Sequence, residues 1–185
     1  GYMGYEGDYQ ASLHIYRDAL PAELQYAASQ VEWVNGCHPA WGYHSSGACN
    51  TYGVHDTFGV YYDSNGDPVS GNAWAKSAWV SNSAFESGHG MSTTVHEAVH
   101  AYSWHVLREC MYEPGISWRS VAREHFSNNG GFVPETGNSS ALNGEEQFAD
   151  GLSKYFGWPG VDQHFPSDIT QTNIDFIEAM FADCN

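Results

Sequence analysis

The chain is poor in basic residues and contains no long hydrophobic run. Its 185 residues include 6 Lys and Arg against 22 Asp and Glu, which gives a formal net charge of −16. Nucleic-acid binding depends on Lys and Arg that displace counterions from phosphates, so we expect neither nucleic acid nor an anionic membrane surface as a partner. No stretch approaches the roughly 18 apolar residues that a membrane helix requires. The acidic charge indicates solubility and, at low ionic strength, some attraction for cationic substrates.

An initiator methionine and a leader sequence are also missing. The chain starts at Gly1 without the basic and apolar segments of a signal peptide, so we expect a processed mature chain. With 42% hydrophobic residues and no repeat or linker, residues 1–185 are predicted to form one domain and a monomer. A subdivision into an N-terminal part, residues 1–90, and a helical part, residues 91–185, flanking a cleft stays open.

The cysteines form no CxxC pair, which argues against zinc-ribbon and thioredoxin-like proteins. Their even number indicates two disulfides in an oxidising compartment, and therefore a secreted, extracellular protein. Three pairings are formally open. We favour Cys37 with Cys49, which closes a short loop, and Cys110 with Cys184, which ties the C-terminal segment to a central helix. The alternative is four reduced and buried thiols.

Hydrophobic periodicity predicts an α+β fold with a mainly helical C-terminal half. Apolar residues at helical spacing, with Gly and Pro as stop signals, predict helices at residues 18–34, 91–112, about 117–126, 144–156 and 171–183. The most clearly defined of these is the helix at 91–112, and a small, mostly antiparallel sheet is expected to pack on it.

The sheet is predicted from two apolar segments. Residues 58–62 and 73–80 are expected to form a hairpin through the turn at 63–68, and residues 37–57, rich in Gly, His and Tyr, an irregular loop. The second strand could offer an edge to an extended peptide by β-augmentation. Its Trp74 and Trp79 are expected in the core.

The clearest chemical signal is the HExxH motif His96-Glu97-Ala98-Val99-His100, inside the predicted helix at 91–112. At about 100° per residue, His96 and His100 lie one turn apart on the same face, so that two imidazoles can reach a single Zn²⁺ ion. Glu97 lies on the flank of that face, where a carboxylate can act as the general base. The alternative is a pair of surface histidines with an incidental glutamate.

A third metal ligand is required, because catalytic zinc generally takes three protein ligands and one water. The long motif HExxHxxGxxH would need Gly and His where the sequence has Ser103 and Val106. His105 points largely away from the metal face at helical spacing. The predicted helix at 144–156 offers acidic residues instead.

Two of these, Glu146 and Asp150, are one turn apart on one helix face. With both motifs present, the chain resembles the gluzincin metallopeptidases, the thermolysin-like branch of the zincins, whose second motif is a Glu ligand followed four residues later by an Asp. The resemblance covers residues 91–112 and 143–156. Glu145, on a different face, and Asp150 itself stay open as alternative third ligands.

The resemblance implies a minimal zincin-like fold and a secreted zinc-dependent endopeptidase that acts on peptide or protein substrates. It implies that His96, His100 and Glu146 bind one catalytic Zn²⁺ and that Glu97 is the general base. It also implies that Asp150 accepts the other ring N–H of a ligating histidine and thereby orients it.

The residue that stabilises the oxyanion is not identified by spacing. Candidates between the two motifs are Tyr112, Arg119, Arg123 and His125. Rival functions are an aromatic-rich binding module, for example for carbohydrate, because the chain has 7 Trp and 12 Tyr, and a zinc hydrolase of a non-peptide amide or an inactive zincin.

Overall fold

The computed structural model describes residues 4–38, 49, 51–56, 60–62, 68–70, 76–131, 144–160 and 164–185. The chain divides into two compact units, Gly1–Ala101 and Tyr102–Asn185. This division lies near the end of the helix that carries the HExxH motif, whereas the sequence analysis placed a subdivision in front of that helix. Among the described residues, no helix combines the length and the apolar character of a membrane span.

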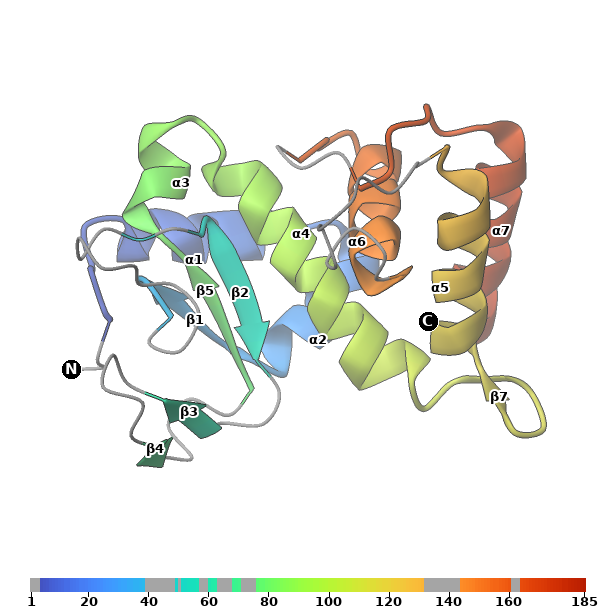
Figure 1. The fold of residues 1–185 in the computed structure, drawn as a ribbon, viewed down its shortest axis with the longest axis horizontal. Coiled ribbons are helices and arrows are strands. Elements are labelled where there is room, and N and C mark those ends of the chain that lie inside the picture. The colour runs from blue at the N-terminus through green and yellow to red at the C-terminus, as the bar shows by residue number, and fades with distance from the viewer. Residues whose placement is uncertain are drawn as a thin grey trace. The chain divides into compact units, whose positions relative to one another are not determined.

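In its described residues, the first unit contains a small sheet together with several helices (Figure 1). Three strands pair in the order β1-β5-β2, with β1 parallel and β2 antiparallel to β5. A separate pair, β3 and β4, is antiparallel. The elements are α1 (Gln10–Asp18), α2 (Ala22–Ser29), β1 (Glu32–Asn35), β2 (Gly53–Asp56), β3 (Val60–Tyr62), β4 (Pro68–Ser70), β5 (Ser77–Val80), α3 (Asn82–Glu86) and α4 (Gly90–Tyr102). The predicted α+β class is confirmed, although the larger sheet is mixed.

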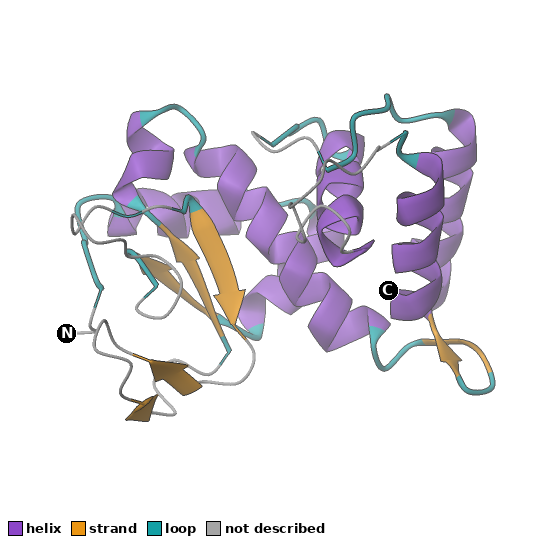
Figure 2. Cartoon of the chain, viewed as in Figure 1, coloured by secondary structure: helices purple, strands orange, loops and turns teal. Residues whose placement is uncertain are grey.

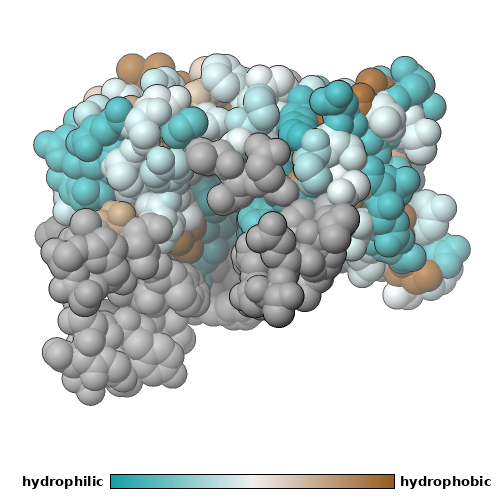
Figure 3. Space-filling view, turned by 45° about the horizontal axis from the view of Figure 1, so that its top comes forward, coloured by the Kyte–Doolittle hydropathy of each residue, from teal (hydrophilic) through white to brown (hydrophobic). Residues whose placement is uncertain are grey.

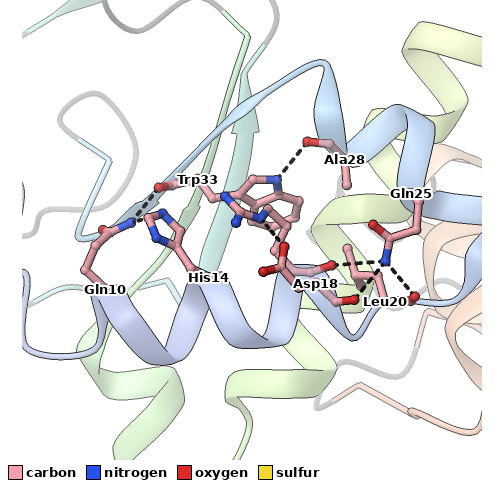
Figure 4. A network of polar contacts seen from close by, with 8 residues as sticks. Gln10, His14, Asp18, Leu20, Gln25, Ala28 and Trp33 are labelled. Atoms are coloured by element: carbon pink, nitrogen blue, oxygen red, sulfur yellow. Dashed lines mark hydrogen bonds and ion pairs between the residues drawn. The ribbon is translucent and has the colours of Figure 1, made fainter.

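The predicted helix at 18–34 is wrong in its second half, because α2 ends at Ser29 and β1 follows. Trp33 and Val34 are both buried although they point to opposite faces of the strand. Figure 4 shows how side chains hold this turn: the Trp33 indole donates to the Ala28 carbonyl at 3.0 Å, and Gln10 of α1 donates to the Trp33 carbonyl at 2.8 Å. Residues 32–35 form a strand because they pair in parallel with β5, which lies far along the chain. Local periodicity therefore could not predict β1.

The predicted hairpin is also wrong in its pairing. Residues 60–62 pair with β4, not with residues 73–80. The latter segment contributes β5, which lies between two strands and offers no free edge. The predicted loop at 37–57 contains β2. Trp79 is fully buried, as predicted, whereas Trp74 and the turn residues 63–67 lie outside the described residues.

The described residues of the second unit form helices, connecting loops and a small hairpin (Figure 2). Its elements are the π-helical turn η1 (Ser103–Leu107), β6 (Met111–Glu113), β7 (Ile116–Ser117), α5 (Trp118–Asn129), α6 (Gly144–Tyr155) and α7 (Gln171–Cys184). The helices predicted at 117–126, 144–156 and 171–183 are thereby confirmed. The helix predicted at 91–112 ends earlier, at Leu107. The chain then reverses at Pro114-Gly115, where Gly115 has φ 83°, a conformation that favours glycine.

Aromatic residues fill the core of this unit between α5, α6 and α7. The Phe126 and Phe148 rings meet edge to face at 5.6 Å between their centroids, and His125 stacks on Phe176 of α7 at 4.1 Å. At Gly151 a Cβ atom would lie 2.3 Å from Cδ1 of Phe126, so α6 lies very close to α5. These contacts set the register of α6 against its neighbour.

Both favoured disulfides are present. Cys37 bonds to Cys49 and Cys110 bonds to Cys184, and no cysteine is free. Two disulfides are typical of a protein from an oxidising, extracellular compartment.

Candidate metal centre

The two histidines of the HExxH motif lie on one face of α4. His96 Nε2 and His100 Nε2 are 3.1 Å apart, and the ring planes are inclined by 77°. The opposite face of α4 carries Ala98 and Ala101, which are fully buried. Burial of this apolar face leaves the two imidazoles, each half-buried, directed toward one common point.

Glu97 lies on the flank of the same helix and is 4% exposed. Strand β2 passes directly beside it: a Cβ atom at Gly53 would lie 3.0 Å from Cγ of Glu97 and 2.7 Å from Cγ2 of Thr93. Glycine is therefore needed at this point for the strand to approach α4 so closely. The sequence analysis did not identify Gly53, since nothing in the neighbouring residues indicates this contact.

Substitution of Gly53 by Ala is expected to destabilise the protein by about 1–3 kcal/mol, the usual range for overpacking. Besides the α4 contacts, the new methyl group would lie 2.8 Å from the Trp79 carbonyl oxygen, which is backbone and cannot turn aside. Chemical denaturation measures the change in the free energy of unfolding.

The matched control is Gly160→Ala, because a Cβ atom there would lie 3.5 Å from Asp150 Oδ1, an ordinary contact. This control is expected to be neutral or slightly stabilising. Equal stability of Gly53→Ala and the wild type would contradict the close approach of β2 to α4.

Glu146, in the first turn of α6, completes a group of possible metal ligands with the two histidines. One ligand atom from each of His96, His100 and Glu146 lies within 4.8 Å of the others, and all three residues are half-buried. Two imidazole nitrogens and one carboxylate oxygen are a donor set that zinc takes in catalytic sites. Tetrahedral zinc with bonds of about 2.0–2.1 Å places two nitrogens about 3.3 Å apart, close to the Nε2 separation here. The group could therefore hold a metal ion, and its donors fit zinc.

Neither alternative third ligand belongs to this group. Glu145 is engaged by two arginines of α5: its Oε2 lies 3.1 Å from Arg119 Nη2 and 3.3 Å from Arg123 Nε. Asp150 is 2% exposed, and its Oδ2 accepts a hydrogen bond from the backbone N–H of His164 at 2.9 Å. That Asp150 also orients a ligating histidine stays a prediction.

The candidate oxyanion donors are distributed over the second unit. Tyr112 is 51% exposed and meets Trp118 edge to face. His125 Nε2 donates to Asn173 Oδ1 at 2.8 Å, toward α7. Arg119 and Arg123 pair with Glu145 as described, an arrangement that the sequence analysis missed because these residues are far apart in the chain. The oxyanion role of any of the four stays a prediction.

His105 is half-buried in η1 and does not belong to the metal-ligand group found among the described residues. The π-helical turn changes the spacing that the sequence analysis assumed for this histidine. That His105 is not a ligand stays a prediction.

No protein-family model matches the chain, and the comparisons with curated proteins and with solved structures found no match either. The function must therefore be argued from the two motifs and from the geometry of their residues.

Proposed function

We propose that this protein is a secreted zinc-dependent metallopeptidase of the gluzincin type. The observation that carries the proposal is the approach of His96, His100 and Glu146, with one ligand atom from each within 4.8 Å of the others. Three protein ligands with a water in the fourth position is the arrangement of catalytic rather than structural zinc. The two disulfides support an extracellular location.

A bound zinc ion would supply Lewis acidity, which makes water nucleophilic at neutral pH and polarises a carbonyl group. The task of the protein is to accept and return a proton. Glu97 is suited to this, because it follows His96 directly and lies on the flank of the ligand face. Its carboxylate takes a proton from the attacking water and delivers it to the leaving amine nitrogen. Burial at 4% exposure restricts the orientations of this side chain.

The strand beside Glu97, β2, favours a peptide over other amides as the substrate. In the part of the chain that the structure describes, β2 pairs with β5 on one side and with no strand on the other. An extended peptide can add to such an edge through main-chain hydrogen bonds. Because Gly53 of β2 borders Glu97, a peptide on this edge would run close to the general base. We therefore assign the binding of an extended peptide to the edge of β2, and no longer to residues 73–80.

A binding module built on aromatic platforms receives less support. Among the residues that the structure describes, the large exposed aromatic residues, Tyr5, Tyr26, Tyr112 and Trp158, come from separate segments of the chain. On the face drawn in Figure 3, hydrophobic residues form small patches separated by hydrophilic ones.

Metal analysis combined with peptide cleavage tests the proposal. Mass spectrometry of the purified protein is expected to find one zinc ion per chain, and a peptide library is expected to be cleaved. Removal of the metal by a chelator should abolish cleavage, and zinc should restore it. Zinc without cleavage of any peptide would favour a non-peptide hydrolase or an inactive zincin, and a protein that binds no zinc would exclude the proposal.

Substitution of Glu146 by Gln is expected to weaken zinc binding by more than about 100-fold, since even partners outside the ligand shell contribute 10–100-fold. The amide keeps the size of the side chain but loses the charge. Competition with a chelating dye measures the dissociation constant. Glu178→Gln, on the exposed side of α7, is the matched control and should bind zinc like the wild type. Equal affinity of the two variants would remove Glu146 from the ligand set.

A further inference from the structure

The Glu145 carboxylate forms ion pairs with two of the few basic side chains of this protein. Only 6 Lys and Arg stand against 22 Asp and Glu, yet Arg119 and Arg123 both lie within salt-bridge distance of the same Oε2 atom. The Glu145 side chain is 14% exposed and that of Arg119 is 24% exposed. Ion pairs that are shielded from solvent lose less to screening than surface pairs. This pairing therefore restrains the side chains that form it.

Besides its ion pair with Glu145, the Arg119 side chain contacts two residues of η1. Its Nε donates to Ser103 Oγ at 3.1 Å, and its guanidinium lies 5.3 Å from the centroid of the Trp104 ring. Both contacts come from η1, the helical turn that continues α4. Two of the three guanidinium nitrogens of Arg119, Nε and Nη2, are thus engaged by Ser103 and Glu145. The arrangement is suited to positioning rather than to binding substrate.

The backbone of α6 approaches α5 at the same place. At Gly144, the first residue of α6, a Cβ atom would lie 3.0 Å from the Arg123 carbonyl oxygen. Gly144 and Glu145 are therefore both held against α5, one by its backbone and the other by its carboxylate. The next residue is Glu146, whose direction follows from the position of this first helical turn.

We propose that Arg119 and Arg123 are positioning residues for the metal site, and that they act through Glu145 to fix the first turn of α6 and thereby the carboxylate of Glu146. The pairing also keeps Glu145 from competing with Glu146 for the cation. This inference rests on the proposed metal-binding role of Glu146. It assigns a function to three charged residues that take no part in the proposed proton transfer by Glu97.

The zinc affinity of arginine variants distinguishes a positioning role of Arg119 and Arg123 from a purely electrostatic effect on the bound cation. Removal of two positive charges near a cation site should strengthen zinc binding if only Coulomb energy mattered. If the arginines position Glu146, the double variant Arg119→Gln/Arg123→Gln should instead bind zinc about 10–100-fold more weakly, as is typical for partners outside the ligand shell. The two explanations predict opposite signs.

The experiment measures the zinc dissociation constant by dye competition, and the melting temperature of the metal-free protein, for four variants. These are the double arginine variant, Glu145→Gln, the triple variant, and Arg108→Gln as the control. Arg108 lies 3.9 Å from the Trp104 ring centroid and pairs with Glu109, so its removal changes charge in the same unit at a residue that pairs with a different glutamate. We expect weaker zinc binding in the first three variants, no further loss in the triple variant, and wild-type affinity in the control.

Three results would overturn the inference. Unchanged or tighter zinc binding by a folded double variant would show that the arginines only stabilise the fold, and would leave the proposed peptidase intact. Additive losses in the triple variant would show that the arginines do not act through Glu145. Absence of zinc from the wild type would overturn both proposals, and is recognised without any variant.

Discussion

Substitution of Glu97 by Gln is expected to reduce peptide cleavage by about 10²–10⁴-fold, the usual contribution of a general acid–base residue. The amide has nearly the shape of the carboxylate but cannot take a proton from water. Glu97 is not part of the predicted ligand set, so zinc should stay bound. Single-turnover cleavage of a fluorogenic peptide, with zinc content measured on the same sample, tests both expectations.

Glu86→Gln on α3 is a suitable control for this variant, because Glu86 is an exposed glutamate of the same unit. It should cleave at the wild-type rate. Loss of zinc from Glu97→Gln would indicate that Glu97 supports the metal site instead of moving protons. Cleavage by this variant at the wild-type rate would require a different base.

Removal of the Cys110–Cys184 disulfide, by serine at both positions, is expected to lower the free energy of unfolding by about 4 kcal/mol. The bond joins residues 74 positions apart, so it removes much conformational freedom from the unfolded chain. It also anchors the end of α7, where Trp118 Nε1 donates to Asp183 Oδ2 at 3.1 Å and the Tyr102 hydroxyl to Asn185 Oδ1 at 2.9 Å. Those hydrogen bonds should weaken when the end of α7 is released.

The Cys37–Cys49 disulfide provides the comparison. Its sequence separation is 12, so the corresponding serine pair should lose only about 3 kcal/mol. Denaturant titrations of both double variants under non-reducing conditions measure the difference. A larger loss for the Cys37–Cys49 pair would show that contacts of the folded state, rather than loop length, dominate.

Local sequence patterns predict the elements of the second unit better than those of the first, for a physical reason. In the second unit, Phe148 and Leu152 of α6 are buried one turn apart, and such spacing is visible within a single segment. In the first unit, Trp33 and Val34 are buried because β5 pairs with β1 from far along the chain. Partners at long sequence separation leave no local signal, so the local patterns predict a helix where β1 lies and a loop where β2 lies.

The candidate site shows the same contrast. His96, Glu97 and His100 are brought together by the pitch of one helix, and the selection of Glu146 rested on its spacing from Asp150. In contrast, Gly53 became relevant only through its closeness to Glu97. The engagement of Glu145 by Arg119 and Arg123 likewise depends on how α5 packs on α6.

By itself, the sequence determined the helices of the second unit, the two preferred cysteine pairs and the one-turn spacing of the HExxH histidines, because each follows from local periodicity or from a count of residues. Tertiary structure alone decided the strand order, the strand that borders Glu97, and the engagement of Glu145 by two arginines of α5. These features depend on packing between segments that are distant in the chain, and packing of that kind is not encoded in the neighbours of any one residue.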